Sequence, residues 1–211
     1  MEHAILYGSG GLAKEMISYL EDRGVRTLYC VSTEPFNNPA YAKLYEVKSA
    51  VSPRDLVRNT SIYMAVASGK LRRQFLKATH ESMLPSFDTF IHPTATVSRF
   101  AKIGRGSVLG PQAIVTGDAQ IGEFVFMNSN ATVGHDTSIG DFCTLHPNSE
   151  VCGDCLIEED CELGIASMIL PGRHLERSTR VSAGSIVRHD FLGFGPDLVL
   201  QGNPAQPRGK K

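Results

Sequence analysis

A histidine between a glycine and an aspartate is the residue of this sequence best suited to move a proton. His135 directly follows Gly134 and directly precedes Asp136. A neutral imidazole can accept a proton from an attacking amine or hydroxyl group, and a neighbouring carboxylate can orient the ring and raise its basicity. The segment therefore predicts a general base at His135 that is assisted by Asp136. The alternative interpretation is a solvated surface histidine.

A glycine-rich turn near the N-terminus could hold a phosphate group. It consists of Gly8, Ser9, Gly10 and Gly11. Glycines let the backbone approach a phosphate, and the helix expected after the turn offers free N–H groups to an anion. A dinucleotide site would also need an acidic residue after the second strand, but residues 30–32 read Cys-Val-Ser. The turn therefore favours the phosphate of a nucleotide sugar over NAD, with an ordinary strand-to-helix turn as the alternative.

A six-residue repeat fills the second half of the chain. Every sixth residue from Ile91 to Val187 is aliphatic, without exception over 17 positions, and the residue four places later is usually small. A period of six fits short strands joined by tight turns, where glycine, which often follows the aliphatic residue, tolerates φ > 0. Three such units would form one coil of a triangular prism, and successive coils would stack at about 4.8 Å.

This register has consequences for two groups of residues. Gly153 follows His135 by three repeat units, so we expect it next to the histidine in the neighbouring coil, where its backbone N–H could stabilise an oxyanion. Three of the five cysteines occupy the small-residue position of the repeat, namely Cys143, Cys155 and Cys161. We therefore expect them to be reduced core thiols rather than the zinc site that their clustering suggests.

Before residue 91 the pattern is that of a small α/β domain. Apolar runs and helical periodicities alternate over residues 3–7, 13–22, 27–31, 62–67 and 70–79. Such alternation is typical of a parallel sheet with helices. The chain is thus expected to contain three parts: a Rossmann-like sugar-nucleotide-binding domain over residues 1–85, a β-helix over 86–190 and a C-terminal tail over 191–211.

The composition excludes several classes of protein. Lys and Arg number 21 against 22 Asp and Glu, a net charge of −1, which argues against nucleic-acid binding through bulk electrostatics. No apolar run approaches the roughly 18 residues of a membrane span, and the first residues lack the features of a signal peptide. We expect a cytoplasmic protein that neither binds nucleic acid nor inserts into a membrane.

Several segments together resemble one family. They are residues 5–15 (ILYGSGGLAKE), 65–73 (AVASGKLRR), 91–95 (IHPTA), 133–136 (VGHD) and 202–205 (GNPA). With the hexads between them, the chain resembles bacterial hexapeptide-repeat sugar acetyltransferases of the sialic-acid O-acetyltransferase and bacillosamine N-acetyltransferase type. The resemblance covers nearly the whole chain. It implies a left-handed parallel β-helix after the small domain, a homotrimer with active sites between subunits, and acetyl-CoA as co-substrate without a metal.

The resemblance also implies roles for individual residues. His135 is the general base, Asp136 is its acidic neighbour, and Gly153 offers an N–H to the thioester. The substrate-binding residues that it implies are Gly8, Ser9, Gly10, Gly11, Ser68 and Asn128. The coenzyme-binding residues that it implies are Thr144, Gly153, Ile165, Ala183, Gly184 and Pro204. The chain departs from the family at Gly134 and Thr144, where relatives carry an acid and a histidine, and it lacks the family's acidic pair after the second strand.

These observations predict acetyl transfer from acetyl-CoA to an amino group of a nucleotide-linked deoxyamino sugar. Three alternatives stay open: O-acetylation of a sugar hydroxyl such as one on sialic acid, a catalytically inactive scaffold that binds a nucleotide sugar, and a hexapeptide-type carbonic anhydrase. The last would need three histidines that converge on zinc between subunits, and His135 and His146 are not separated by a whole coil.

Overall fold

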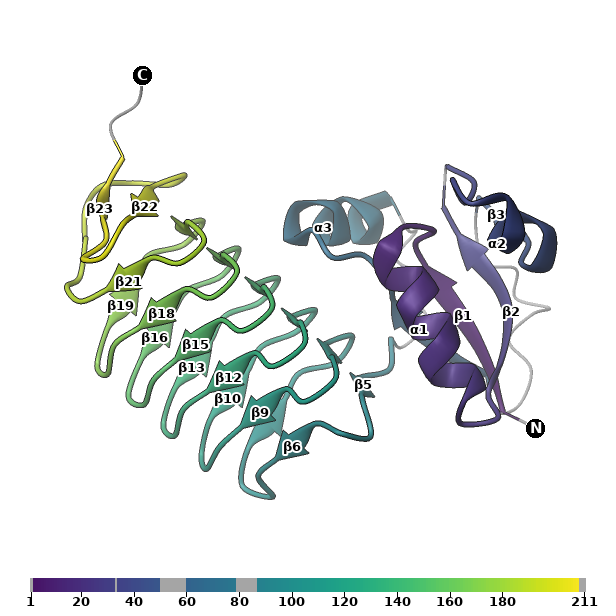
Figure 1. Cartoon of the computed structure of the whole chain (residues 1–211), viewed down its shortest axis with the longest axis horizontal. Helices are drawn as coiled ribbons and strands as arrows, with labels where there is room; N and C mark the ends of the chain where they lie inside the picture. Colours follow the sequence, from purple (N-terminus) through teal and green to yellow (C-terminus); the bar gives the residue numbers. More distant parts are fainter. Residues whose placement is uncertain (1, 33, 50–59, 79–86, 209–211) are drawn as a thin grey trace. The chain divides into compact units, whose positions relative to one another are not determined.

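The computed structural model describes residues 2–32, 34–49, 60–78 and 87–208. The chain divides into two compact units, Met1–Thr89 and Phe90–Lys211. The first unit contains a sheet with helices, and the second is a stack of short strands (Figure 1). The predicted combination of an α/β part and an all-β part is therefore confirmed.

The described residues of the first unit form a four-stranded parallel sheet and three helices. The strands are β1 (His3–Tyr7), β2 (Arg26–Val31), β3 (Val47–Lys48) and β4 (Thr60–Met64). The helices are α1 (Gly11–Glu21), α2 (Pro39–Leu44) and α3 (Gly69–Ala78). Residues 4–6 of β1 are completely buried, and α1 buries an apolar face that includes Met16, Ile17 and Leu20. The sheet core thus comes from the apolar runs that the sequence indicated.

The direction in which the strands are added reverses at β1. The strand order is β3-β2-β1-β4, so β2 and β3 lie on one side of β1 and β4 on the other. The turn after β1 and the loop after β4 are in close contact, because a Cβ on Gly8 would lie only 2.5 Å from the carbonyl oxygen of Ala65. Ligands of open α/β sheets bind at such a reversal, outside the carboxyl ends of the strands.

Some boundaries in this unit differ from the expectation. The strand expected over 62–67 ends at Met64, because Ala65 already belongs to the loop that packs against Gly8. Helix α2 and strand β3 were not predicted. The signals for α2 are Pro39 in its first turn and Asn38 before it, whose Oδ1 accepts the Ala40 N–H at 2.9 Å. Of the helix expected over 70–79, residue 79 lies outside the described residues.

The second unit is the parallel β-helix that the hexads predict. Its described residues contain 17 successive two-residue strands, and each ends on one of the aliphatic residues of the repeat. The eight-stranded sheet includes β5 (Phe90–Ile91), β8 (Val108–Leu109), β11 (Phe126–Met127), β14 (Thr144–Leu145), β17 (Glu162–Leu163) and β20 (Arg180–Val181). The six-stranded sheet contains β6 (Thr96–Val97), β9 (Ile114–Val115), β12 (Thr132–Val133), β15 (Glu150–Val151), β18 (Met168–Ile169) and β21 (Ile186–Val187). The five-stranded sheet contains β7 (Lys102–Ile103), β10 (Gln120–Ile121), β13 (Ser138–Ile139), β16 (Leu156–Ile157) and β19 (His174–Leu175).

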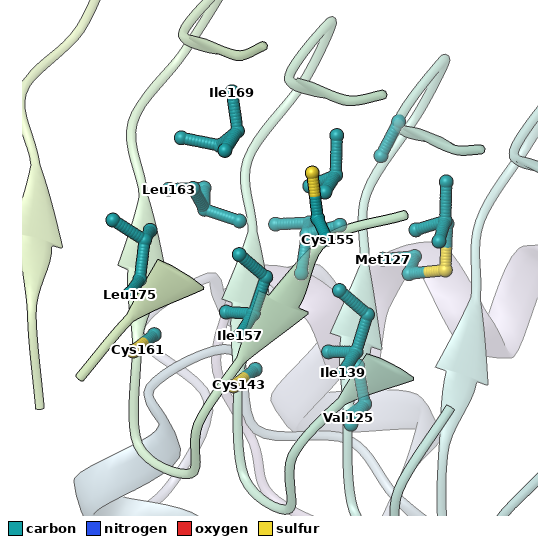
Figure 2. Close-up of a cluster of buried hydrophobic side chains, with 14 of the residues drawn as sticks. Val125, Met127, Ile139, Cys143, Cys155, Ile157, Cys161, Leu163, Ile169 and Leu175 are labelled. Carbon is teal, nitrogen blue, oxygen red and sulfur yellow. The ribbon is translucent and has the colours of Figure 1, made fainter. Parts of the chain in front are cut away.

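Strands of neighbouring coils pair with a register of three repeat units. Ile121 pairs with Ile139, and Ile139 pairs with Ile157. The aliphatic side chains fill the lumen, as Figure 2 shows for Ile139, Ile157 and others. The chain thus places residues that are one coil apart in sequence directly above one another.

Hydroxyl and thiol side chains in the small-residue position tie neighbouring coils together. Thr137 Oγ1 donates to the carbonyl of Cys152 at 2.8 Å and accepts the N–H of Cys155 at 3.1 Å. Cys143 and Cys161 are buried and donate to carbonyls 3.1 and 3.2 Å away. None of the five cysteines, all of which lie in the described residues, is in a disulfide. The interpretation of Cys143, Cys155 and Cys161 as core thiols is confirmed (Figure 2).

The reason for the glycines that follow the aliphatic residues differs from the one expected. Gly104, Gly134 and Gly140 do not have positive φ; instead, a Cβ on each would lie 2.4–2.5 Å from backbone atoms of the next coil. Positive φ occurs two residues further on, at Gly106 and Asp136 for example, and recurs every sixth residue over much of the prism. The glycines therefore permit close stacking, while the left-handed conformation belongs to a position often filled by Asp or Asn.

The segment after the last hexad extends the prism. Strand β22 (Val199–Gln201) pairs in parallel with β20, and β23 (Gln206–Pro207) pairs antiparallel with β22. Leu200 and Ala205 are buried in the core that fills the lumen. The part expected as a tail that leaves the repeat thus closes the C-terminal end of the stack.

Candidate active site

His135 lies at the corner between the six-stranded and five-stranded sheets. It is in the turn that leads from β12 to β13. Gly134 lets the turn approach the next coil, because a Cβ there would lie 2.5 Å from the carbonyl carbon of Cys152. The His135 side chain leaves the prism and is 64% exposed. The predicted outward orientation of this side chain is confirmed.

Asp136 orients the imidazole. Its Oδ2 lies 2.8 Å from His135 Nδ1, and its backbone has the left-handed conformation of the corner, with φ of 57°. Because a carboxylate only accepts hydrogen bonds, we assign the proton to Nδ1, which leaves Nε2 as an acceptor. The hydrogen bond with Asp136 raises the pKa of His135, opposed by desolvation and supported by the charges of Asp136 and Asp154.

Gly153 lies directly against the imidazole, as the register of the coils predicts. A Cβ on Gly153 would lie 2.6 Å from both Cε1 and Nε2 of His135. Glycine at this position therefore leaves room for the ring. Within the part of the chain that the structure describes, the Gly153 N–H makes no hydrogen bond.

Asp154 is a member of this group that the sequence analysis missed. Its N–H donates to the carbonyl of His135 at 2.9 Å, and it has the same left-handed conformation as Asp136, with φ of 59°. Ligand atoms of His135, Asp136 and Asp154 all lie within 4.8 Å of one another, and all three residues are exposed. The signal for Asp154 was its register, three repeat units after Asp136.

The short distances between the ligand atoms of His135, Asp136 and Asp154 would also suit a metal ion. His135 Nδ1, however, is already engaged by Asp136, and the other possible ligands of the cluster are two carboxylates open to water. We interpret the cluster as one that handles protons. His146 is not part of it, because its Nε2 lies 2.9 Å from Glu162 Oε1 on the eight-stranded sheet.

A second group of predicted residues lies at the opposite edge of the six-stranded sheet. Ile165, Ala183 and Gly184 follow β17 and β20, at the corner with the eight-stranded sheet. They are neighbours: Gly184 N–H donates to Ile165 O at 2.8 Å, and Gly164 leaves room for the backbone of Ala183. Ile165 is 54% exposed. One chain therefore brings these residues together, but at a different corner from His135.

The remaining predicted residues of the prism lie in strands of the eight-stranded sheet or in the turns that follow them. Pro204 is exposed in the turn after β22, beside Ala205, whose N–H donates to Ile186 O at 2.7 Å. Asn128 follows β11 and uses its Oδ1 to accept the Ser129 N–H at 2.7 Å. Thr144 lies in β14 and is only 4% exposed, so its side chain offers little surface to a ligand within a single chain.

The N-terminal turn lies at the reversal of the sheet. Gly8 has φ of 130° and packs against Ala65, as described above. Gly10 and Gly11 face open space, because an added Cβ on either would meet no atom within 4 Å. Their backbone is thus accessible at the start of α1, as a phosphate site would require.

The two serines of this region serve the loops themselves. Ser9 Oγ donates to the carbonyl of Glu34 at 2.7 Å and lies 3.0 Å from Ser32 Oγ. Ser68 caps α3, with its Oγ 3.4 Å from the Leu71 N–H. A ligand would therefore meet the backbone of Ser9 more readily than its hydroxyl.

Arg72 supports the loop after β4, although the sequence analysis gave it no role. It is almost completely buried, and its guanidinium donates to the carbonyls of Val66 at 3.0 Å and Ala67 at 2.5 Å. A buried arginine that donates to a loop fixes the path of that loop next to Gly8.

No protein-family model and no curated protein sequence matches the chain, whereas several solved structures do. PerB from Caulobacter crescentus, in complex with CoA and GDP-perosamine, superposes with a TM-score of 0.79 at 25% identity over 99% of this chain and 98% of its own. The acetyltransferase domain of PglB from Neisseria gonorrhoeae FA1090 gives 0.81 at 24% over 99% and 100%. WeeI from Acinetobacter baumannii AYE gives 0.76 at 19% over 99% and 100%.

These similarities confirm the predicted fold over the whole chain, a small α/β domain followed by a left-handed parallel β-helix. The names of PerB's ligands and of the PglB domain agree with the predicted chemistry, acetyl transfer from acetyl-CoA to a nucleotide sugar. Among the helices that the structure describes, none is long and apolar enough to cross a membrane.

Proposed function

We propose that this protein transfers an acetyl group from acetyl-CoA to the amino group of a nucleotide-linked deoxyamino sugar. The observation that carries the proposal is the packing of the His135 imidazole between Asp136 and Gly153, with Nδ1 2.8 Å from the carboxylate and Nε2 against the glycine. The ligands of PerB, CoA and GDP-perosamine, supply both classes of substrate in a protein of the same fold.

The arrangement suits direct transfer. The amine nitrogen of the acceptor attacks the carbonyl carbon of the acetyl thioester while His135 Nε2 takes the proton that nitrogen loses. The Gly153 N–H donates to the developing oxyanion. The C–S bond then breaks, and the imidazolium passes its proton to the leaving thiolate, which gives the N-acetyl sugar and the free thiol of coenzyme A. Asp136 keeps Nδ1 protonated and Nε2 ready to accept.

The N-terminal turn would bind the nucleotide part of the acceptor. Two features support this: Gly10 and Gly11 leave their backbone open at the start of α1, and the turn lies at the reversal of the strand order. Asn128 would contact the sugar. The phosphate would bind to the backbone of the turn, since the Ser9 hydroxyl is engaged with Glu34.

The coenzyme would bind where two chains meet, in a homotrimer. Ile165, Ala183, Gly184 and Pro204 lie at a different corner of the prism from His135, so a neighbouring chain is needed to unite the two groups. Exposed apolar side chains on the outer faces, such as Ile114, Leu156 and Ile165, suit burial between prisms. Light scattering of the purified protein should give the mass of three chains.

We also propose that the reaction takes place in the cytoplasm. None of the five cysteines in the described residues forms a disulfide, as is usual for proteins of a compartment that keeps thiols reduced.

Replacement of His135 tests the function. His135→Ala should lower kcat about 10²- to 10⁴-fold, the usual contribution of a general base, with thiol release from acetyl-CoA as the readout. The far-UV spectrum and the mass of the assembly should stay unchanged, because the side chain is exposed. Near-normal turnover in this variant would overturn the assignment, and a panel of amino and hydroxyl sugars would separate N- from O-acetylation.

A further inference from the structure

The carboxylate of Asp154 has no part in the transfer described above, although it lies beside the base. We infer that Asp154 holds the acceptor's amino group, as an ammonium ion, next to His135 and so makes the site selective for amines over hydroxyls. The inference rests on the proposed acetyl transfer at His135. It assigns to this chain a specificity-determining residue of that reaction.

The backbone fixes Asp154 in place. Its N–H donates to the carbonyl of His135 at 2.9 Å, and its φ of 59° is that of the tight corner. It therefore lies one coil from Asp136 in the same corner of the prism, with its carboxylate, the Asp136 carboxylate and the imidazole all within 4.8 Å. Gly153 has no side chain that could separate Asp154 from the ring.

The two carboxylates are not equivalent. Asp136 is committed to His135 Nδ1 at 2.8 Å. Asp154, by contrast, makes no side-chain hydrogen bond or ion pair within the residues that the structure describes, and it is exposed. Asp154 thus presents an available anion beside His135, and its charge contributes to the raised pKa of that histidine.

An amine and a hydroxyl differ in what they gain from such an anion. Near neutral pH an aliphatic amine is largely an ammonium ion, which forms charge-assisted hydrogen bonds with a carboxylate, whereas a sugar hydroxyl stays neutral. One proton of the bound ammonium passes to water before the attack. The amine then bonds to the acetyl carbon, the C–S bond breaks, and the second proton reaches the thiolate through His135, so that one N-acetyl sugar, one thiol and one free proton result.

Asp154→Asn tests the inference, because asparagine has the same shape and tolerates the left-handed backbone. The acceptors are GDP-perosamine and its counterpart with a hydroxyl in place of the amino group, extended to other nucleotide-linked amino sugars and their hydroxyl counterparts until thiol release is found. Asp160→Asn is the control, since Asp160 has φ of 62° and lies between β16 and β17, at the corner of the five-stranded and eight-stranded sheets rather than at that of His135. It should behave as the wild type.

We expect KM for the amino sugar to rise about tenfold in Asp154→Asn, the usual effect of one charge-assisted hydrogen bond, with a smaller change in kcat. The kcat/KM for the hydroxyl sugar should stay within twofold. In a titration followed by NMR, the imidazole of His135 should also show a lower pKa than in the wild type, which a remote structural effect would not produce.

An equal loss for both acceptors, or no loss for either, would overturn the role of Asp154 while leaving the proposed function intact if His135→Ala is inactive. An unchanged His135 titration would overturn the placement of the carboxylate beside the ring. The absence of thiol release by the wild type with every amino sugar would overturn the proposed function and this inference together.

Discussion

His135 owes its position to two residues that have no side chain. Gly134 lets its turn stack closely on the next coil, and Gly153 leaves the space that the ring fills. The register of three repeat units per coil predicted the contact between Gly153 and the ring, whereas the close stacking at Gly134 was not predicted, because that glycine was expected to have a positive φ. The same register also places Asp154 one coil from Asp136, but it was applied only to His135, so Asp154 was missed.

The contact between Gly153 and His135 can be tested by adding one methyl group. Gly153→Ala would place Cβ 2.6 Å from Cε1 and Nε2 of the imidazole, and the exposed ring would have to move. A displacement of about 1 Å can lower the rate about 10²-fold. Steady-state kinetics should show this loss in kcat with little change in the melting temperature. Unchanged kcat would contradict the idea that Gly153 positions the base.

The hydrogen bond between His135 and Asp136 predicts the direction of a pH effect. Because it raises the pKa of His135, the imidazole becomes a competent base only at a higher pH than an isolated histidine would. In Asp136→Asn this cause is removed, so the acidic limb of the kcat/KM profile should move to lower pH, while the plateau falls because the ring is less well oriented. An acidic limb that stays in place or moves upward would argue against the assignment of that limb to His135.

At the scale of the elements, the hexads predicted all 17 strands from β5 to β21, and their aliphatic residues are buried from Leu109 onward, whereas Ile91 in the first strand is exposed. Periodicity succeeds there because each coil repeats one environment. It fails for α2 and β3, which are too short to show a period. Periodicity also gave the wrong reason for the glycines that follow the strands. A glycine in a sequence can indicate either a positive φ or a close approach between coils, and the sequence alone does not distinguish the two.

Two alanine substitutions separate these explanations for the glycines. Gly104→Ala would place Cβ 2.4 Å from the carbonyl group of Gly122, whereas Gly117→Ala would meet nothing within 4 Å. We expect the first to lower the free energy of unfolding by about 1–3 kcal/mol, as overpacking does, and the second to change it by less than about 0.5 kcal/mol. Denaturant unfolding measures both, and equal effects would refute the stacking explanation.

At the scale of the whole molecule, the chain joins two folds. In the proposed function, the α/β unit binds the nucleotide of the acceptor and the prism carries out the acetyl transfer. The α/β unit has an open glycine turn at its strand reversal, and the prism has the histidine cluster. The sequence indicated both features, the turn by its local motif and the histidine cluster by a local motif together with the register of the coils. The group around Ile165 lies at a different corner from His135, and the sequence indicated these residues but not how they would meet the histidine.

The role of the N-terminal turn can be separated from that of the prism by thermal shift. Gly10→Asp puts a negative charge at the start of α1, in open space and with φ of −82°, which aspartate adopts readily. The variant should lose most of the stabilisation that a nucleotide sugar gives to the wild type, because the carboxylate repels the phosphate. Stabilisation by coenzyme A should be retained and is the internal control. Equal stabilisation by the nucleotide sugar would place its phosphate elsewhere.

The reversed strand at the C-terminal end of the stack has a consequence for solubility. A parallel β-helix presents an unpaired strand at its last coil, and such an edge can recruit the same edge of another molecule and start a polymer. Here β23 covers β22 in the opposite direction, and one of its two residues is Pro207, which has no N–H to offer a further strand. On the face formed by the eight-stranded sheet, the chain thus ends with a segment that discourages pairing with the edge of another molecule.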